Sequence, residues 1–147
     1  MPSLTRRAFL GTSSALLLAA AGCTAPDSSP RPAHWVTVYL VDEEHPRDVT
    51  VTVTDNGGET VFERDYQLSE TNEADEDAPF PASADPETVV VTVDGTRFER
   101  DWPGFEQPRL PCDSDLNHSG IEVWIRTEQD GSPTIRLKAD CQHVTVK

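Results

Sequence analysis

Basic residues are scarce in this chain, and no stretch has the periodicity and end caps of an amphipathic helix. The chain has 12 lysines and arginines, of which only two are lysines, and 26 aspartates and glutamates. Its formal net charge is therefore −14. Nucleic acid is therefore excluded as a partner, because its phosphates would be repelled. The same charge disfavours docking on an anionic membrane by electrostatic attraction alone.

Motifs of the common hydrolases are also missing. The chain has neither Gly-x-Ser-x-Gly, which marks a serine nucleophile, nor His-Glu-x-x-His, which marks a zinc protease. Carboxylates are so abundant that no pair of them singles out a general acid and base. His34 and His45 flank the first predicted strand, and we expect both at the surface. These absences favour a protein that is not an enzyme and that needs no cofactor.

The first 23 residues have the pattern of an export signal with a lipidation site. The twin arginines Arg6 and Arg7 precede an apolar run, Ala15–Gly22, that is too short to span a bilayer comfortably. The run ends at Gly22-Cys23, which resembles a lipobox, where the cysteine is lipidated and becomes the new N-terminus. We therefore expect residues 1–22 to be a Tat signal peptide and Cys23 to anchor the protein on the extracellular face of the cytoplasmic membrane.

The remaining chain divides into a short tether and one domain. Residues 23–33 are rich in proline and serine without apolar periodicity, so they predict a flexible, lipid-anchored tether. Residues 34–147 are long enough for a single modest core. Residues 1–22 hold two of the basic residues and none of the acidic ones, so the processed chain has a net charge of −16. A protein this acidic needs salt to screen its self-repulsion, which favours a salt-loving source.

Apolar and polar residues alternate with period two along most of the domain. The pattern is clearest in Val49–Thr54 and returns in five further segments: Val36–Leu40, Thr60–Leu68, Val89–Val93, Ile121–Thr127 and Thr134–Ala139. Turn residues separate these segments, and Arg97–Trp102 and the end of the chain add two weaker strands. About seven short strands predict an all-β fold, an antiparallel β-sandwich.

Two polar segments between the strands are candidates for ligand or glycan attachment. Glu70–Asp77 gathers acidic side chains that could hold Ca²⁺, but it lacks the spacing of a calcium loop, so we expect a solvated loop. Asn117 begins an Asn-His-Ser sequence, which is the acceptor pattern for N-glycosylation.

The cysteines leave two alternatives open. With Cys23 taken by lipid, Cys112 and Cys141 remain in a chain exported to an oxidising compartment, which favours a disulfide with Cα atoms within about 7 Å. The alternative is a metal site, such as that of a small copper carrier, formed by four residues: Cys112, His118, Cys141 and His143. A copper site usually adds an axial methionine, and the only methionine here is Met1.

Tryptophans are the candidate contact residues. Trp124 alternates with Ile121, Val123 and Ile125, so it is predicted to face away from them, as an exposed contact anchor or as part of a second apolar layer. We expect Trp35 and Trp102 to pack in the core or at a sheet edge.

Cys23, the tether, the Val/Thr strands and the late Cys112 and Cys141 together resemble the small Ig-like lipoproteins of haloarchaea. The resemblance implies an Ig-like sandwich and a surface location, without an assigned activity. We therefore predict a non-enzymatic interaction or structural module, held to the membrane by lipid and contacting a surface or envelope protein. The alternatives are a copper-binding electron carrier and a substrate-binding accessory lipoprotein.

Overall fold

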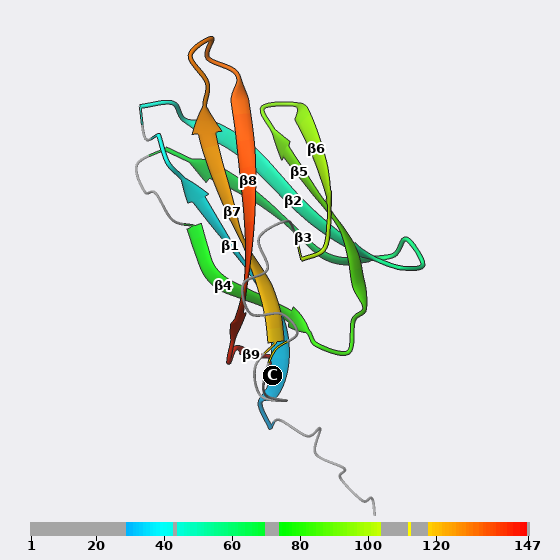
Figure 1. The fold of residues 1–147 in the computed structure, drawn as a ribbon. Coiled ribbons are helices and arrows are strands. Elements are labelled where there is room, and N and C mark those ends of the chain that lie inside the picture. Colours follow the sequence, from blue (N-terminus) through cyan, green and yellow to red (C-terminus); the bar gives the residue numbers. More distant parts are fainter. Residues whose placement is uncertain (1–28, 43, 70–73, 104–111, 113–117, 147) are drawn as a thin grey trace, which may run out of the picture.

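The structure is a computed structural model that describes residues 29–42, 44–69, 74–103, 112 and 118–146. Nine strands follow one another along this part of the chain (Figure 1): β1 (Arg31–Leu40), β2 (Arg47–Asp55), β3 (Thr60–Leu68), β4 (Ala74–Pro81), β5 (Pro86–Val93), β6 (Thr96–Asp101), β7 (His118–Thr127), β8 (Pro133–Gln142) and β9 (Thr145–Val146). Within these residues no helix is long and apolar enough to cross a membrane.

The strands form two sheets that face each other. One has the order β4-β1-β7-β8, with β9 added to the start of β1, and the other has the order β3-β2-β5-β6. All of the pairings are antiparallel except that of β1 with β7, which is parallel from Trp35 opposite Gly120 to Leu40 opposite Ile125. Because β1 and β7 run the same way, the start of β1 lies at the opposite end of the sandwich from the β7–β8 hairpin (Figure 1).

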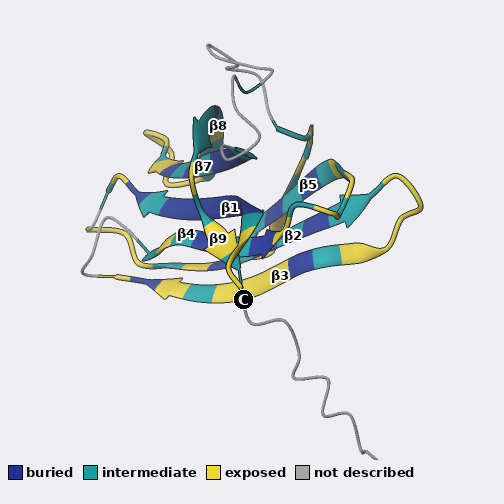
Figure 2. Cartoon of the chain, turned by 90° about the horizontal axis from the view of Figure 1, so that it is seen from below, coloured by how far each residue is buried: buried dark blue, intermediate teal, exposed yellow. Residues whose placement is uncertain are grey.

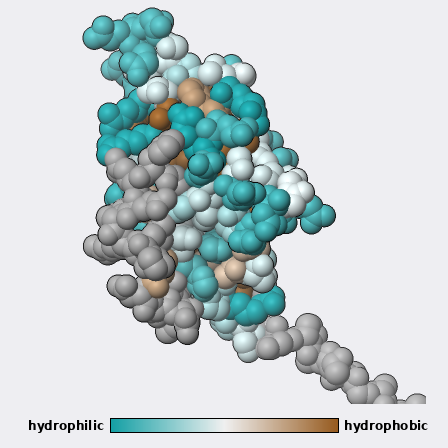
Figure 3. Space-filling model, turned by 45° about the vertical axis from the view of Figure 1, so that its right-hand side comes forward, coloured by the Kyte–Doolittle hydropathy of each residue, from teal (hydrophilic) through white to brown (hydrophobic). Residues whose placement is uncertain are grey.

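The core is made by the side chains on the inner faces of both sheets. Valines at every second position of β2 and β5 are almost fully buried, and they face a layer of aliphatic residues from β1, β7 and β8. Along β2 and β5 buried and less buried residues alternate, as the period of two requires, whereas β1 is buried on both faces from Ala33 to Val38 (Figure 2). The outer surface in Figure 3 is largely hydrophilic, with small apolar areas between polar side chains.

This architecture confirms the predicted all-β sandwich and adds details. The predicted strand Thr60–Leu68 has the bounds of β3. β7 begins earlier than its predicted strand, and β8 is longer than its predicted strand at both ends. Nine strands are present instead of about seven, and one pairing is parallel. The first strand begins at Arg31, so the last three residues of the predicted tether lie in β1, where Ala33 is fully buried.

The prediction of a solvated loop over Glu70–Asp77 is wrong for its second half, which belongs to the edge strand β4. Asp75 and Asp77 take left-handed backbone angles (φ 54° and 50°), where the pairing with β1 shifts register. Aspartate tolerates these angles better than most residues, so the strand can bulge here. The Asp75 carboxylate accepts hydrogen bonds from Arg64 (2.5 Å) and from the Tyr66 hydroxyl (3.1 Å), both on β3. Asp75 therefore holds the two sheets together at this edge.

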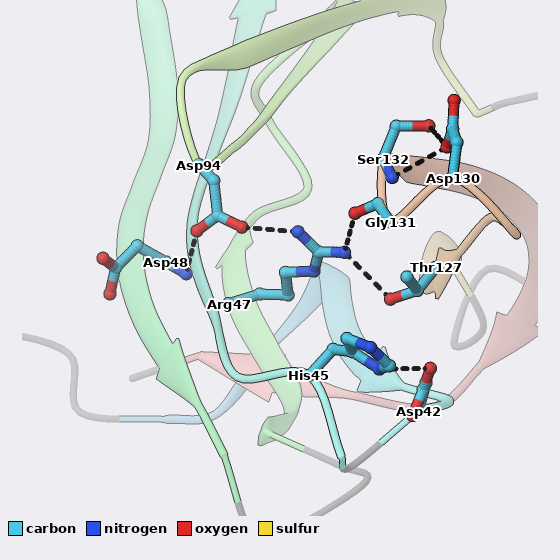
Figure 4. A network of polar contacts seen from close by, with 9 residues as sticks. All are labelled: Asp42, His45, Arg47, Asp48, Asp94, Thr127, Asp130, Gly131 and Ser132. Atoms are coloured by element: carbon cyan, nitrogen blue, oxygen red, sulfur yellow. Dashed lines mark hydrogen bonds and ion pairs between the residues drawn. The ribbon is translucent and has the colours of Figure 1, made fainter.

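At the end of the sandwich that carries the β5–β6 and β7–β8 turns, the sheets are connected through Arg47 (Figure 4). Its guanidinium donates hydrogen bonds to Asp94 in the β5–β6 turn (2.8 Å), to the Thr127 hydroxyl (2.9 Å) and to the Gly131 carbonyl (2.9 Å). Asp94 in turn accepts a hydrogen bond from the Asp48 amide (2.9 Å). The hydrogen bonds from Arg47 lower the pKa of Asp94 below its ordinary value. The start of β2 is thus tied to the turns of both sheets.

We predict that Arg47→Met lowers the free energy of unfolding by about 2 kcal/mol. The charge-assisted hydrogen bonds of the guanidinium are lost, and the acceptor atoms of Asp94 and Thr127 and the Gly131 carbonyl are left without this donor. The Arg47 side chain is only 9% exposed, so water cannot replace these bonds fully. Arg97→Met is the matched control, since the Arg97–Glu99 pair is 60% and 54% exposed and an exposed pair contributes about 0–1 kcal/mol. Urea unfolding measures both variants, and equal losses would contradict the role given to Arg47.

Candidate interaction surface

The outer face of the β1–β7–β8 part of the sandwich carries aromatic and basic side chains. Along β7, Ile121, Val123 and Ile125 are fully buried, so the residues between them point outward. The outward positions of β7 and β8 are Glu122, Trp124, Arg126, Thr134, Arg136 and Lys138. The prediction that Trp124 faces away from the isoleucines and Val123 is confirmed by this alternation.

Trp124 is held in place by contacts on two sides. It stacks on Tyr39 of β1, with ring centroids 4.2 Å apart and an angle of 16° between the ring planes. Its indole Nε1 donates a hydrogen bond to Glu122 Oε2 (3.2 Å), and the same oxygen lies 3.6 Å from Lys138 Nζ. Tyr39 and Arg136 are the register partners of Trp124 on the two neighbouring strands. The indole is therefore fixed by neighbours on β1 and by Glu122 on its own strand.

A hollow of about 300 Å³ opens on this face. It is lined by Trp124, Arg126, Arg136 and Lys138, which come from the β7–β8 hairpin alone. Three basic side chains therefore surround one indole, in a chain that has 12 basic residues in all. Three cations line the hollow and the Glu122 carboxylate borders it, so the hollow is locally positive on an acidic protein.

The opposite end of the same sheet is packed around His34, which corrects the expectation that this residue lies at the surface. Its ring contacts Phe80, Trp102 and His118 at centroid distances of 5.3, 5.7 and 5.7 Å. Its Nδ1 lies 2.8 Å from the carbonyl oxygen of Ser119 and so donates a proton to it. Burial, and to a smaller degree the neighbouring His118, lower the pKa of His34 below 6.5.

Trp35 and Trp102 pack as the sequence suggested. Trp35 is fully buried against Gly120, where a Cβ atom would come within 2.0 Å of the indole, so only glycine fits. Its Nε1 donates to the His118 carbonyl (3.2 Å). Trp102 is half-buried and contacts Phe80 edge to face (5.5 Å). His45 is exposed as expected and pairs with Asp42 (2.7 Å).

The predicted pair Cys112 and Cys141 is joined in a disulfide, with Cα atoms 5.7 Å apart. Both sulfurs are bonded to each other, so neither is free to be the thiolate ligand that the alternative metal site with His118 and His143 requires. His118 faces His34 and His143 is exposed. No group of three or more histidine, cysteine, aspartate or glutamate side chains among the described residues is placed to hold a metal ion.

Four other predicted site residues lie outside the residues that the structure describes. These are Arg6 and Arg7 of the twin-arginine motif, the lipidation site Cys23, and the glycan acceptor Asn117. The same holds for Glu70 and Glu73 of the acidic segment. Their assigned roles stay predictions.

Comparison with known families settles the fold family. Residues 45–137, more than half of the chain, match the family described as the halobacterial Ig-like domain. The chain belongs to this family. The Ig-like sandwich and the haloarchaeal relationship are thereby confirmed, whereas export and lipidation are not tested by the match. No curated protein and no solved structure matches the chain significantly.

The match places most of the hollow inside the halobacterial Ig-like domain. The matched segment runs from just before β2 into β8, so it contains Glu122, Trp124, Arg126 and Arg136. It leaves out Lys138 and all of β1, including Tyr39. The stacking partner of Trp124 thus comes from outside the matched segment.

We predict that acid destabilises the protein partly through His34. The folded-state pKa is lowered, so below pH 6.5 the unfolded chain binds a proton that the folded chain does not, and stability falls as the pH drops. His34→Asn keeps an amide donor for the Ser119 carbonyl but cannot titrate. Melting temperatures between pH 8 and 5 should therefore fall less steeply in His34→Asn than in the wild type.

The exposed His143 provides the control for this measurement, because His143→Asn removes a histidine that the fold does not bury. Its melting temperature should follow the wild-type slope. Identical slopes for His34→Asn and the wild type would show that burial of His34 does not govern the acid response.

Proposed function

We propose that the protein is a non-enzymatic surface module, held by lipid on Cys23 at the outer side of the cytoplasmic membrane, which contacts a partner through the outer face of β1, β7 and β8. The observation that carries this proposal is the hollow beside Trp124, where an ordered indole and three basic side chains meet on a rigid sheet. Buried aromatic and arginine residues are the side chains that most often dominate binding energy at protein surfaces.

The position of the hollow suits a protein anchored at its N-terminus. From Arg31 to Tyr39 the strand β1 rises by about 26 Å, at about 3.3 Å per residue. Figure 1 shows the β7–β8 hairpin at the end of the sandwich that is remote from the start of β1. A lipid on Cys23 would hold the start of β1 near the membrane, so the hollow would point away from it toward other surface components.

The acidity of the chain supports a saline environment. Its charge of −14 favours solubility and requires screening by salt, which fits the haloarchaeal family. Two of the cations, Arg47 and Arg64, join the two sheets instead of lying on the outer face of β7 and β8.

Lipid anchoring is tested by replacing Cys23, the residue proposed to carry the lipid. We predict that Cys23→Ser, expressed in a haloarchaeal host, is released into the medium or stays as the unprocessed precursor, because serine has no thiol to carry the lipid. Thr24→Ser, at the next position, should be processed and retained in the membrane. Immunoblots of membrane and medium fractions measure both, and a Cys23→Ser protein that is processed normally and stays in the membrane would contradict the proposal.

A further inference from the structure

We propose that the hollow lined by Trp124, Arg126, Arg136 and Lys138 binds an acidic polysaccharide, a chain of sugar rings that carry carboxylate or sulfate groups. This inference rests on the proposed function and names the class of partner. It is carried by the charge of the hollow, by the chemistry of its lining and by its size.

The charge of the hollow selects an anion. Its lining holds three basic side chains, and the carboxylate beside them is that of Glu122, whose Oε2 lies 3.6 Å from Lys138 Nζ. Arg126 is exposed and, within the part of the chain that the structure describes, has no hydrogen bond or ion pair. A guanidinium presents a planar pair of donors that matches a carboxylate or a sulfate. An anion on the ligand would thus meet a cation that the protein has not neutralised.

The indole of Trp124 and the neighbouring Glu122, which borders the lining, favour a sugar over a purely anionic ligand. Glu122 stands beside the cations, where its Oε2 contacts Trp124 and Lys138, and a carboxylate accepts hydrogen bonds from hydroxyl groups. Trp124 offers an apolar surface that Tyr39 and Glu122 hold in position, so little side-chain entropy is lost on binding. A sugar acid combines an anion, hydroxyl donors and apolar C–H faces within one ring, and the hollow offers a partner for each.

The size of the hollow fits a short stretch of a polymer. Its volume of about 300 Å³ is at the lower end of the range for small-molecule sites, which is about 300–1,000 Å³. A stable protein partner would bury about 800 Å² on each side, so a protein would have to extend well beyond this lining.

Binding of alginate oligosaccharides, which are polymers of uronic acid, to the purified full chain in detergent tests the proposal. Isothermal titration calorimetry should detect alginate binding and should detect no binding of neutral dextran. The double variant Arg126→Gln/Arg136→Gln should weaken alginate binding at least tenfold. The matched double variant Arg97→Gln/Arg100→Gln removes the same charge from β6 of the other sheet and should change the affinity less than twofold.

Trp124→Leu separates sugar recognition from simple charge attraction. It leaves every basic residue in place, and it should still weaken alginate binding severalfold while circular dichroism shows the wild-type fold. Equal loss in the two double variants would overturn the proposal, because binding would then follow net charge.

Poly-L-glutamate binding that matches alginate binding in strength and in its dependence on Arg126 and Arg136 would also overturn it, in favour of an acidic peptide. In that case the outer face would remain the interaction surface of the proposed function. Absence of binding to any anion would overturn the ligand class, while the fate of Cys23→Ser reports on the surface location separately.

Discussion

The structure depends on the alternation of side chains between the two faces of each strand. On β2 the valines at positions 49, 51 and 53 point into the core, and the residues between them point to the outer face. The same alternation occurs on β5, β7 and β8. A shift of one residue in any pairing would send the valines outward and bury threonines and charges. This constraint fixes the register of both sheets, and it also decides which residues are free to form an outer surface.

The few cations of the chain are divided between two uses. Arg47, at the end of the sandwich with the β5–β6 and β7–β8 turns, bonds to Thr127 and Gly131, and Arg64, at the β3–β4 edge, bonds to Asp75; both arginines join one sheet to the other. Arg126, Arg136 and Lys138 gather instead on one outer face, beside an indole. A strongly acidic protein gains no solubility from concentrating its positive charge in one place, so this arrangement points to recognition of an anionic partner.

The strands with Val/Thr alternation and the outward direction of Trp124 could be predicted from the sequence, because both follow from the period-two pattern of apolar residues. The cysteine pair could be predicted because an exported chain reaches an oxidising compartment. It did not reveal β4, where acidic residues and two prolines conceal a bulged edge strand. Nor could it reveal the burial of His34 or the stacking of Trp124 on Tyr39. Both depend on the parallel pairing of β1 with β7, which brings together segments more than 80 residues apart.

The central claim is that the outer face of β1, β7 and β8 is the surface that binds. Nuclear magnetic resonance spectra of the ¹⁵N-labelled full chain, recorded while alginate oligosaccharides are added, test it most directly, since each amide and each indole N–H reports its own surroundings. The account predicts that the Trp124 indole signal and the amides of β7 and β8 around the hollow shift together, while those of β3 and β6 stay in place. Shifts confined to the β3-β2-β5-β6 sheet, or no shift at saturating oligosaccharide, would contradict it.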